Sequence, residues 1–172
     1  MKKIKVIAAI MLTSLVMGCG TNLKDGVAFL EEGKYEDAIT CFEAEIAEGK
    51  KFAEAYRGMA ISYFELEDFE SAVEYFDMVL ADEETKKTAS IYAMKAASHL
   101  QLEQLDEALE AYQNALSFEC TEELKQEILF NEIAIYQELG DWEVLKEKVT
   151  AYVANYPEDT RMNKTVEFLE TR

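Results

Sequence analysis

Apolar residues recur at intervals of three and four positions along most of the chain, a period typical of amphipathic helices. One eight-residue pattern, with a large apolar residue first and a small residue fourth, occurs at 35–42, 69–76 and 105–112 and more faintly at 142–149. Nine residues before the fourth position of each copy stands a ring side chain: Phe29, Tyr63, His99 and Tyr136. This interval is constant, whereas successive copies are 34 to 37 residues apart. The pattern predicts rigid helix pairs with slightly variable connections between them.

These units resemble the tetratricopeptide repeat, a helix–turn–helix unit of about 34 residues. The second unit carries the most complete match, with Tyr56, Met59, Ala60, Tyr63, Ala72, Phe76 and Val79. The resemblance implies an all-α, right-handed solenoid of about four helix pairs, with repeats at about 22–52, 53–86, 87–121 and 122–157. A capping helix is expected over 158–172, where one apolar stripe is formed by Met162, Val166 and Leu169. The alternative architecture is an up-and-down helical bundle whose periodicity is fortuitous.

Two kinds of position suggest how such units pack. A small residue would let the two helices of a unit approach closely in the first three units (Ala38, Ala72 and Ala108). An aromatic residue would fill the space between neighbouring units (Phe42, Phe76 and Tyr112). The fourth unit replaces the small residue by Leu145 and matches the family less well. Since one unit cannot bury its apolar face alone, three or more must stack.

The first twenty residues have the features of a bacterial secretory signal. Three lysines precede an apolar run over 6–17, which is shorter than the roughly 20 residues that span a bilayer. The run ends in Val16-Met17-Gly18-Cys19, which resembles the lipobox of bacterial lipoproteins. The resemblance implies that residues 1–18 are removed, that Cys19 is lipidated, and that residues 19–21 are the anchor and a very short linker. An ordinary signal peptide and an N-terminal membrane anchor with a chance Cys are the alternatives.

This reading also predicts a location and a charge. The protein would be attached to the cell membrane or outer membrane through lipid alone, with its repeat domain outside the cytoplasm. The full chain has 17 basic and 35 acidic residues, a net charge of −18, and loss of three signal lysines would make the mature charge −21. So negative a surface repels phosphate backbones, which excludes nucleic acid as the expected partner.

Catalytic and metal-binding patterns are missing from the sequence. It has no glycine-rich phosphate loop, nucleophile elbow, two-His metal motif or calcium-loop spacing, so we expect no enzyme, no metal and no cofactor. His99 falls at a packing position and is interpreted as structural. The acidic run 82–84 is interpreted as a solvated loop, and Cys41 and Cys120 as separate thiols with no disulfide between them.

In tetratricopeptide-repeat proteins the first helices line a concave face that binds peptides of partner proteins. The resemblance implies that this groove contains Arg57, Ile61, Phe64, Glu65, Met94, Ala97, Leu100, Gln101, Asn131, Ala134 and Gln137. Four of these would form an exposed apolar strip: Ile61, Phe64, Met94 and Leu100. We expect a protein-interaction scaffold whose partner has apolar anchors and cationic flanks. The alternative function is an accessory small-molecule-binding protein of an envelope enzyme or transport system.

Lipidation at Cys19 is directly testable. The Cys19→Ala variant should lose labelled palmitate and leave the membrane fraction, because no thiol remains to carry the acyl chains. Cys41→Ala is the matched control and should keep both label and membrane attachment. Parent-like labelling and fractionation of Cys19→Ala would contradict the assignment.

Overall fold

The computed structural model describes residues 23–49, 52–83 and 86–171. This part of the chain contains no strand. Its helices are α1 (Leu23–Glu31), α2 (Tyr35–Ala47), α3 (Phe52–Glu65), α4 (Phe69–Ala81), α5 (Ala89–Gln101), α6 (Leu105–Leu116), α7 (Glu122–Leu139), α8 (Trp142–Asn155), the 3-10 helix η1 (Thr160–Met162) and α9 (Asn163–Glu170). None of these helices is both long enough and apolar enough to cross a membrane. The signal segment and Cys19 lie outside the described residues, so their assignment stays a prediction.

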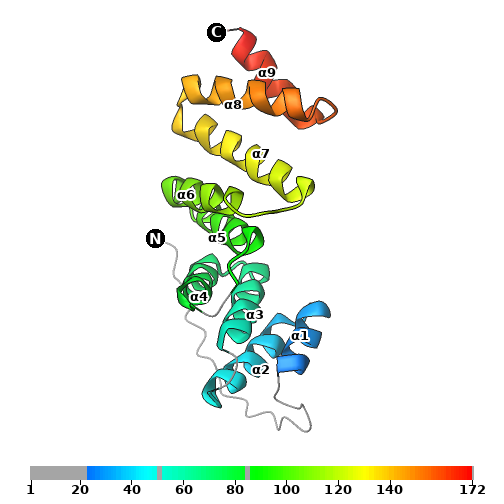
Figure 1. Cartoon of the computed structure of the whole chain (residues 1–172), viewed down its shortest axis with the longest axis vertical. Coiled ribbons are helices and arrows are strands. Elements are labelled where there is room, and N and C mark those ends of the chain that lie inside the picture. Colours follow the sequence, from blue (N-terminus) through cyan, green and yellow to red (C-terminus); the bar gives the residue numbers. More distant parts are fainter. Residues whose placement is uncertain (1–22, 50–51, 84–85, 172) are drawn as a thin grey trace, which may run out of the picture.

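The helices form hairpins that stack along one axis, with α1 and α2 at one end and α9 at the other (Figure 1). The hairpins are α1–α2, α3–α4, α5–α6 and α7–α8, and each one packs on the next along the chain. The buried apolar residues accordingly form four successive clusters rather than one shared core. The predicted all-α solenoid of four helix pairs and a C-terminal helix is confirmed, and the bundle alternative is excluded.

One turn geometry explains the constant nine-residue interval. Four residues after each ring position, the backbone turns through the left-handed region, with φ between 59° and 72° at Gly33, Glu67, Glu103 and Gly140. The next residue donates its N–H to the carbonyl of the ring residue over 2.8–3.2 Å in every unit. Such a bond closes the end of a helix and satisfies one of its last carbonyls. Since the second helix then begins at the following residue, the small residue falls at the same distance each time.

Acidic residues stabilise the starts of two second helices. Asp68 and Asp141 are the N-caps of α4 and α8, and their carboxylates accept hydrogen bonds at 3.2 Å from the N–H groups of Ser71 and Val144. Negative charge is favourable there because the first amides of a helix lack backbone partners. Part of the high acid content therefore has a local structural use.

The small and aromatic positions pack as the sequence predicts. Ala38, Ala72 and Ala108 are fully buried, and so are the aromatic residues between units: Phe42, Phe76 and Tyr112. The Phe42 ring lies between two glycines of successive first helices, Gly26 and Gly58. A Cβ atom would stand 2.6 Å from the ring at Gly26 and 2.3 Å from it at Gly58. The close approach of α1 and α3 to this ring thus requires glycine at both positions.

The last helix pair is built differently. Leu145 occupies the small position and is buried, and Val149 stands where the other units have an aromatic ring. Tyr152, three residues later, is the buried aromatic of this unit. The helices are also joined by an ion pair, in which Lys148 of α8 donates to the fully buried Glu132 of α7 over 2.9 Å. The fourth unit therefore keeps the hairpin but changes the side chains that close it.

The C-terminal segment is attached by a polar network and one buried side chain. Met162 of η1 is buried against the α7–α8 pair, while α9 has no fully buried residue. Arg161 donates to both carboxylate oxygens of Asp159, and also to Glu127 over 2.9 and 3.1 Å, and its guanidinium lies 4.1 Å from the centre of the Phe130 ring. Arg161 holds the pKa of Asp159 well below its usual value. The network fixes η1 firmly and α9 less so.

The packing around Phe42 generates a stability prediction. Gly58→Ala should lower the free energy of unfolding by about 1–3 kcal/mol, because the new methyl group overlaps a ring that has no room to move. This loss exceeds the gain of about 1 kcal/mol expected from the higher helix propensity of Ala. Urea denaturation followed by circular dichroism measures the change. In a Phe42→Leu background, Gly58→Ala should cost less stability than it does in the parent protein. A raised denaturation midpoint for Gly58→Ala alone would refute the explanation.

Candidate functional site

The predicted groove residues all lie on the first helices α3, α5 and α7, and they differ in exposure. Four polar ones are exposed: Arg57, Glu65, Gln101 and Gln137. The others are half-buried: Ile61, Phe64, Met94, Ala97, Leu100, Asn131 and Ala134. The structure thus places polar groups at the surface of this face, and the smaller or apolar ones partly beneath them.

The four-residue apolar strip is less exposed than the sequence analysis expected. Phe64 and Met94 pack against the buried cluster of the second unit, and Phe64 also meets Phe69 edge-on at 5.6 Å between ring centres. Leu100 packs against the buried cluster of the third unit. The strip therefore helps to hold the helices together, and only part of its area is available to a ligand. Truncating Phe64 and Met94 would affect folding as well as binding.

Two polar groove candidates are engaged between units. The Tyr35 hydroxyl donates to Glu65 over 3.2 Å, which links the first unit to the second. Asn131 donates through Nδ2 to the Tyr112 hydroxyl over 3.0 Å, which links α7 to α6. Burial raises the pKa of Tyr112 to about 12, against the smaller opposite effect of the Asn131 bond. Asn131 therefore satisfies a buried hydroxyl at the junction of two units.

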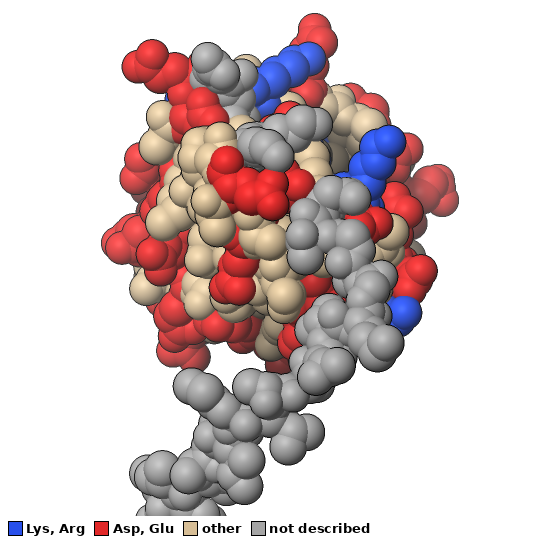
Figure 2. All heavy atoms as spheres, turned by 90° about the horizontal axis from the view of Figure 1, so that it is seen from below, with Lys and Arg blue, Asp and Glu red and all other residues tan. Residues whose placement is uncertain are grey.

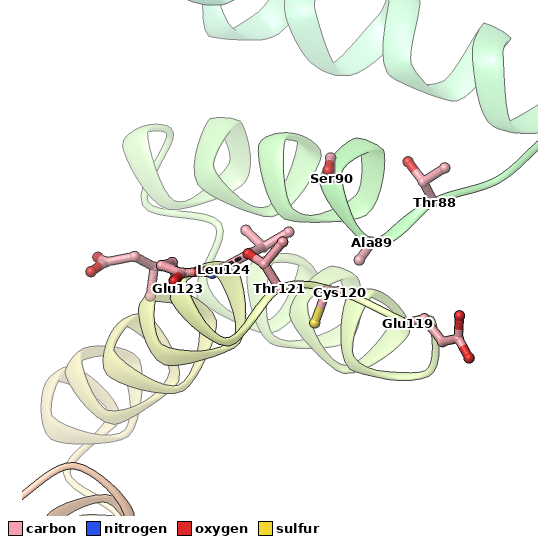
Figure 3. A pocket seen from close by; sticks show the side chains of 9 residues that line it. Thr88, Ala89, Ser90, Glu119, Cys120, Thr121, Glu123 and Leu124 are labelled. Atoms are coloured by element: carbon pink, nitrogen blue, oxygen red, sulfur yellow. Dashed lines mark hydrogen bonds between the residues drawn. The ribbon is translucent and has the colours of Figure 1, made fainter.

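A hollow of about 570 Å³ lies where the starts of α5 and α7 meet the α6–α7 loop (Figure 3). Thr88, Ala89 and Ser90 line one side, and Cys120, Thr121 and Leu124 line the other. The Thr88 hydroxyl does not cap α5, and its oxygen is buried without a hydrogen-bond partner among the described residues. The sequence analysis missed this hollow. The available signal was a Thr directly before each of these helices, at 88 and 121.

Acidic groups stand at the edges of the hollow. Glu119 and Glu123 point away from its centre at opposite ends (Figure 3). The pKa of Glu123 is lowered by a hydrogen bond from the backbone N–H of the same residue and, to a smaller extent, by one from the Thr121 hydroxyl. Glu127, which also lines the hollow, is paired with Arg161. The hollow thus has the exposed Ser90 hydroxyl on one side, the helix-capping Thr121 hydroxyl on the other, and carboxylates at its ends.

Acidic side chains are also numerous at the α1–α2 end of the molecule (Figure 2). Seen from the α1–α2 end, Asp and Glu side chains surround most of the visible surface and Lys and Arg are few (Figure 2). Such a distribution attracts a positively charged partner over long range and repels a negatively charged one.

The structure also places the other candidates for chemistry, which are His99 and the two cysteines of the described residues. His99 is buried, and its Nδ1 lies 2.6 Å from Oε1 of Gln104, so its ring secures the α5–α6 turn. Cys41 is buried in α2 and Cys120 is half-buried in a loop, and no disulfide joins them. Within the described ranges, no group of three or more His, Cys, Asp or Glu side chains is placed to hold a metal ion.

Comparison with known families gives the assignment. One family model of the tetratricopeptide repeat matches residues 23–90 and a second matches residues 89–119, so together they span more than half of the chain. The chain is a tetratricopeptide-repeat protein. The matches end at residue 119, before the fourth unit of this repeat protein, where Leu145 and Val149 replace the usual small and aromatic residues.

Solved structures resemble the repeat protein in fold. MamA from AMB-1 superposes with a TM-score of 0.70 at 14% identity, over 85% of this chain and 77% of that one. MamA from Desulfovibrio magneticus RS-1 gives 0.64 at 17% identity, over 82% and 79%. The first TPR domain of human RPAP3 gives 0.57 at 23% identity, over 69% and 90%. No curated protein sequence matches significantly. At these identities the likeness establishes the fold alone.

The role of Asn131 at the junction leads to a prediction. Asn131→Ala should lower the free energy of unfolding by about 1–3 kcal/mol, because it leaves the buried Tyr112 hydroxyl without its partner. Gln137→Ala, at an exposed position of the same helix, is the control and should change stability by less than about 0.5 kcal/mol. Chemical denaturation measures both. Equal effects would mean that the hydrogen bond contributes nothing specific.

Proposed function

We propose that the protein is a protein-interaction scaffold, attached to a membrane by lipid on Cys19, that binds a peptide segment of a partner on its first-helix face. The observation that carries the proposal is the hollow between α5 and α7, which adjoins the half-buried apolar side chains of the same helices. The exposed Ser90 hydroxyl can pair with a peptide backbone, and Ala97 and Leu100 can contact apolar side chains further along α5.

The expected partner is basic. Exposed carboxylates stand beside this face at Glu65, Glu119 and Glu123, and the expected mature chain has a net charge of −21. Complementary charge raises the association rate and excludes acidic competitors, while the apolar contacts slow dissociation. A segment with one or two apolar anchors between Lys or Arg residues fits both features.

Lipid attachment would give the scaffold its location. Only three residues, 20–22, separate Cys19 from the start of α1. The first repeat would therefore follow the acyl chains almost directly, and the stack would begin close to the lipid surface. Two or three acyl chains make such attachment effectively permanent, since each buried methylene contributes about 0.8 kcal/mol.

A small-molecule-binding accessory role is the second candidate, and the same hollow is the observation that favours it. It has the size of a ligand site and is lined by the polar side chains of Ser90 and Thr121. The outward direction of Glu119 and Glu123 favours the peptide instead, because neither carboxylate converges on a bound molecule (Figure 3).

Site-specific crosslinking in the native cells tests the scaffold. A photo-reactive amino acid at Gln101, exposed on α5, should form a covalent product with a partner protein because it borders the first-helix face. The same amino acid at Gln113, exposed on the second helix α6, is the matched control and should not. The crosslinked segment is identified by mass spectrometry and synthesised for calorimetry.

The follow-up separates binding from folding. Ala97→Arg, which places a bulky cation on the first-helix face, should weaken binding of the synthetic peptide at least tenfold and leave the helical content unchanged. Equal crosslinking from Gln101 and Gln113, or unchanged binding to Ala97→Arg, would refute the first-helix face as the site. A small molecule that co-purifies and protects Cys120 from alkylation would instead support the second candidate.

A further inference from the structure

The charge of the chain is distributed very unevenly. Residues 23–141 contain 29 acidic and nine basic residues, a net charge of −20, whereas residues 142–172 contain six acidic and five basic residues, a net charge of −1. The second range comprises α8, η1 and α9, which form one end of the solenoid (Figure 1). Two copies of this protein repel each other along the rest of their length. The C-terminal end is the part where two copies can approach without that repulsion.

The same end carries an apolar groove of about 450 Å³ between α8 and α9. Val149 and Val153 of α8 form one wall, and Val166 and Leu169 of α9 form the other. Val153 is 37% exposed, although the other exposed positions of α8 are mostly polar. Beside the groove, at the start of α8, Trp142 is 41% exposed and packs on Phe168 at 5.4 Å between ring centres.

The architecture explains why this groove is left open. In each of the four hairpins, the first helix is covered by a second helix of the same unit. The helix α9 follows α8 as the first helix of a fifth unit would, and no second helix covers it in the described chain. The surface next to α9 and α8 is therefore shaped to receive another amphipathic helix.

We propose that a second copy of the chain fills this groove, so that two molecules associate end to end through their α8–α9 surfaces. The near-neutral charge of this end singles out a second copy as the occupant, because the proposed basic partner of the first-helix face has no electrostatic reason to bind here. A two-fold arrangement lets each α9 cover the groove of the other copy, and it closes the assembly at two molecules.

The lining of the groove contains one charge of each sign. Lys146 of α8 and Glu170 of α9 both line it, and neither has an ion-pair partner among the described residues. A two-fold axis near this end brings Lys146 of each copy to Glu170 of the other, which forms two equivalent ion pairs. Charges placed in this way select the pairing and its register more than they strengthen it.

The first experiment measures association of residues 20–172, which include every described helix. Sedimentation equilibrium should show a monomer–dimer equilibrium for the parent chain. Val153→Glu should weaken dimerisation at least tenfold, since each copy would bury an unpaired charge. Val27→Glu is the matched control, because Val27 of α1 is 41% exposed at the opposite end. It should dimerise like the parent, and both variants should keep the helical content of the parent.

The second experiment uses charge reversal. Lys146→Glu and Glu170→Lys should each be monomeric alone, because each places like charges opposite one another across the two-fold axis. An equimolar mixture of the two variants should form a heterodimer, since every pair across the axis is then opposite in charge. Contacts within one copy cannot produce that recovery, so the mixture separates an intermolecular ion pair from an effect on folding.

Each outcome decides the proposal. A parent chain that stays monomeric up to about 100 μM, assemblies larger than two, or a Val153→Glu variant that dimerises like the parent would overturn it. Failure of the charge-reversed mixture to recover the dimer would overturn the two-fold pairing of Lys146 with Glu170. None of these results depends on the peptide-binding function proposed above, which uses the first-helix face.

Discussion

The structure depends on one packing constraint: a buried aromatic ring must fit between each helix pair and the next. At the first junction the ring is Phe42, enclosed by Gly26 and Gly58, and at the second it is Phe76, packed among the small and branched residues of its neighbours. Each ring belongs to a second helix and contacts the first helix of the following unit. The distance and angle between successive units are therefore set by side chains of fixed shape, and the first-helix face has a fixed form as a result.

The chemistry of these junctions changes along the stack. The first two rings are phenylalanines, whereas Tyr112 and Tyr152 bring hydroxyl groups that need partners at the third and fourth junctions. Tyr112 is satisfied by Asn131, and Tyr152 donates to Asp159. Apolar contacts tolerate small shifts, but a buried hydroxyl fixes the relative position of two helices because it loses its partner if they slide. The last two junctions thus add a directional hydrogen bond to the apolar packing that fixes the first two.

The sequence predicted the structural features that recur in every unit and missed those that occur in one unit only. The helix pairs, their turns, the buried alanines and three junction aromatics follow from periodicity, since the same local pattern serves the same contact each time. The buried aromatic of the last unit was not predictable in this way. The repeat position for an aromatic residue holds Val149 there, and the aromatic side chain that is buried is Tyr152, three residues later. The burial of Glu132 was not predictable either, because its ion-pair partner Lys148 lies opposite it only in the folded chain. The exposure of Phe64 and Met94 was overestimated for a related reason, because helix periodicity gives the direction of a side chain but not the distance to the neighbouring helix.

The left-handed turns have a consequence for how the middle of the stack folds. Gly33 and Gly140 adopt that conformation readily, but Glu67 and Glu103 are good helix formers held at φ values of 60° and 59°. Taken alone, the segments around these glutamates favour one uninterrupted helix, and the turn exists because packing against the neighbouring hairpins outweighs that preference by more than the roughly 1–2 kcal/mol strain of each residue. The second and third units therefore lack the glycine that favours this turn in the first and fourth units, although Asp68 still caps the start of α4 in the second. Their turns depend more on packing against the neighbouring hairpins than the glycine turns do, so we expect folding to be most cooperative in the middle of the solenoid.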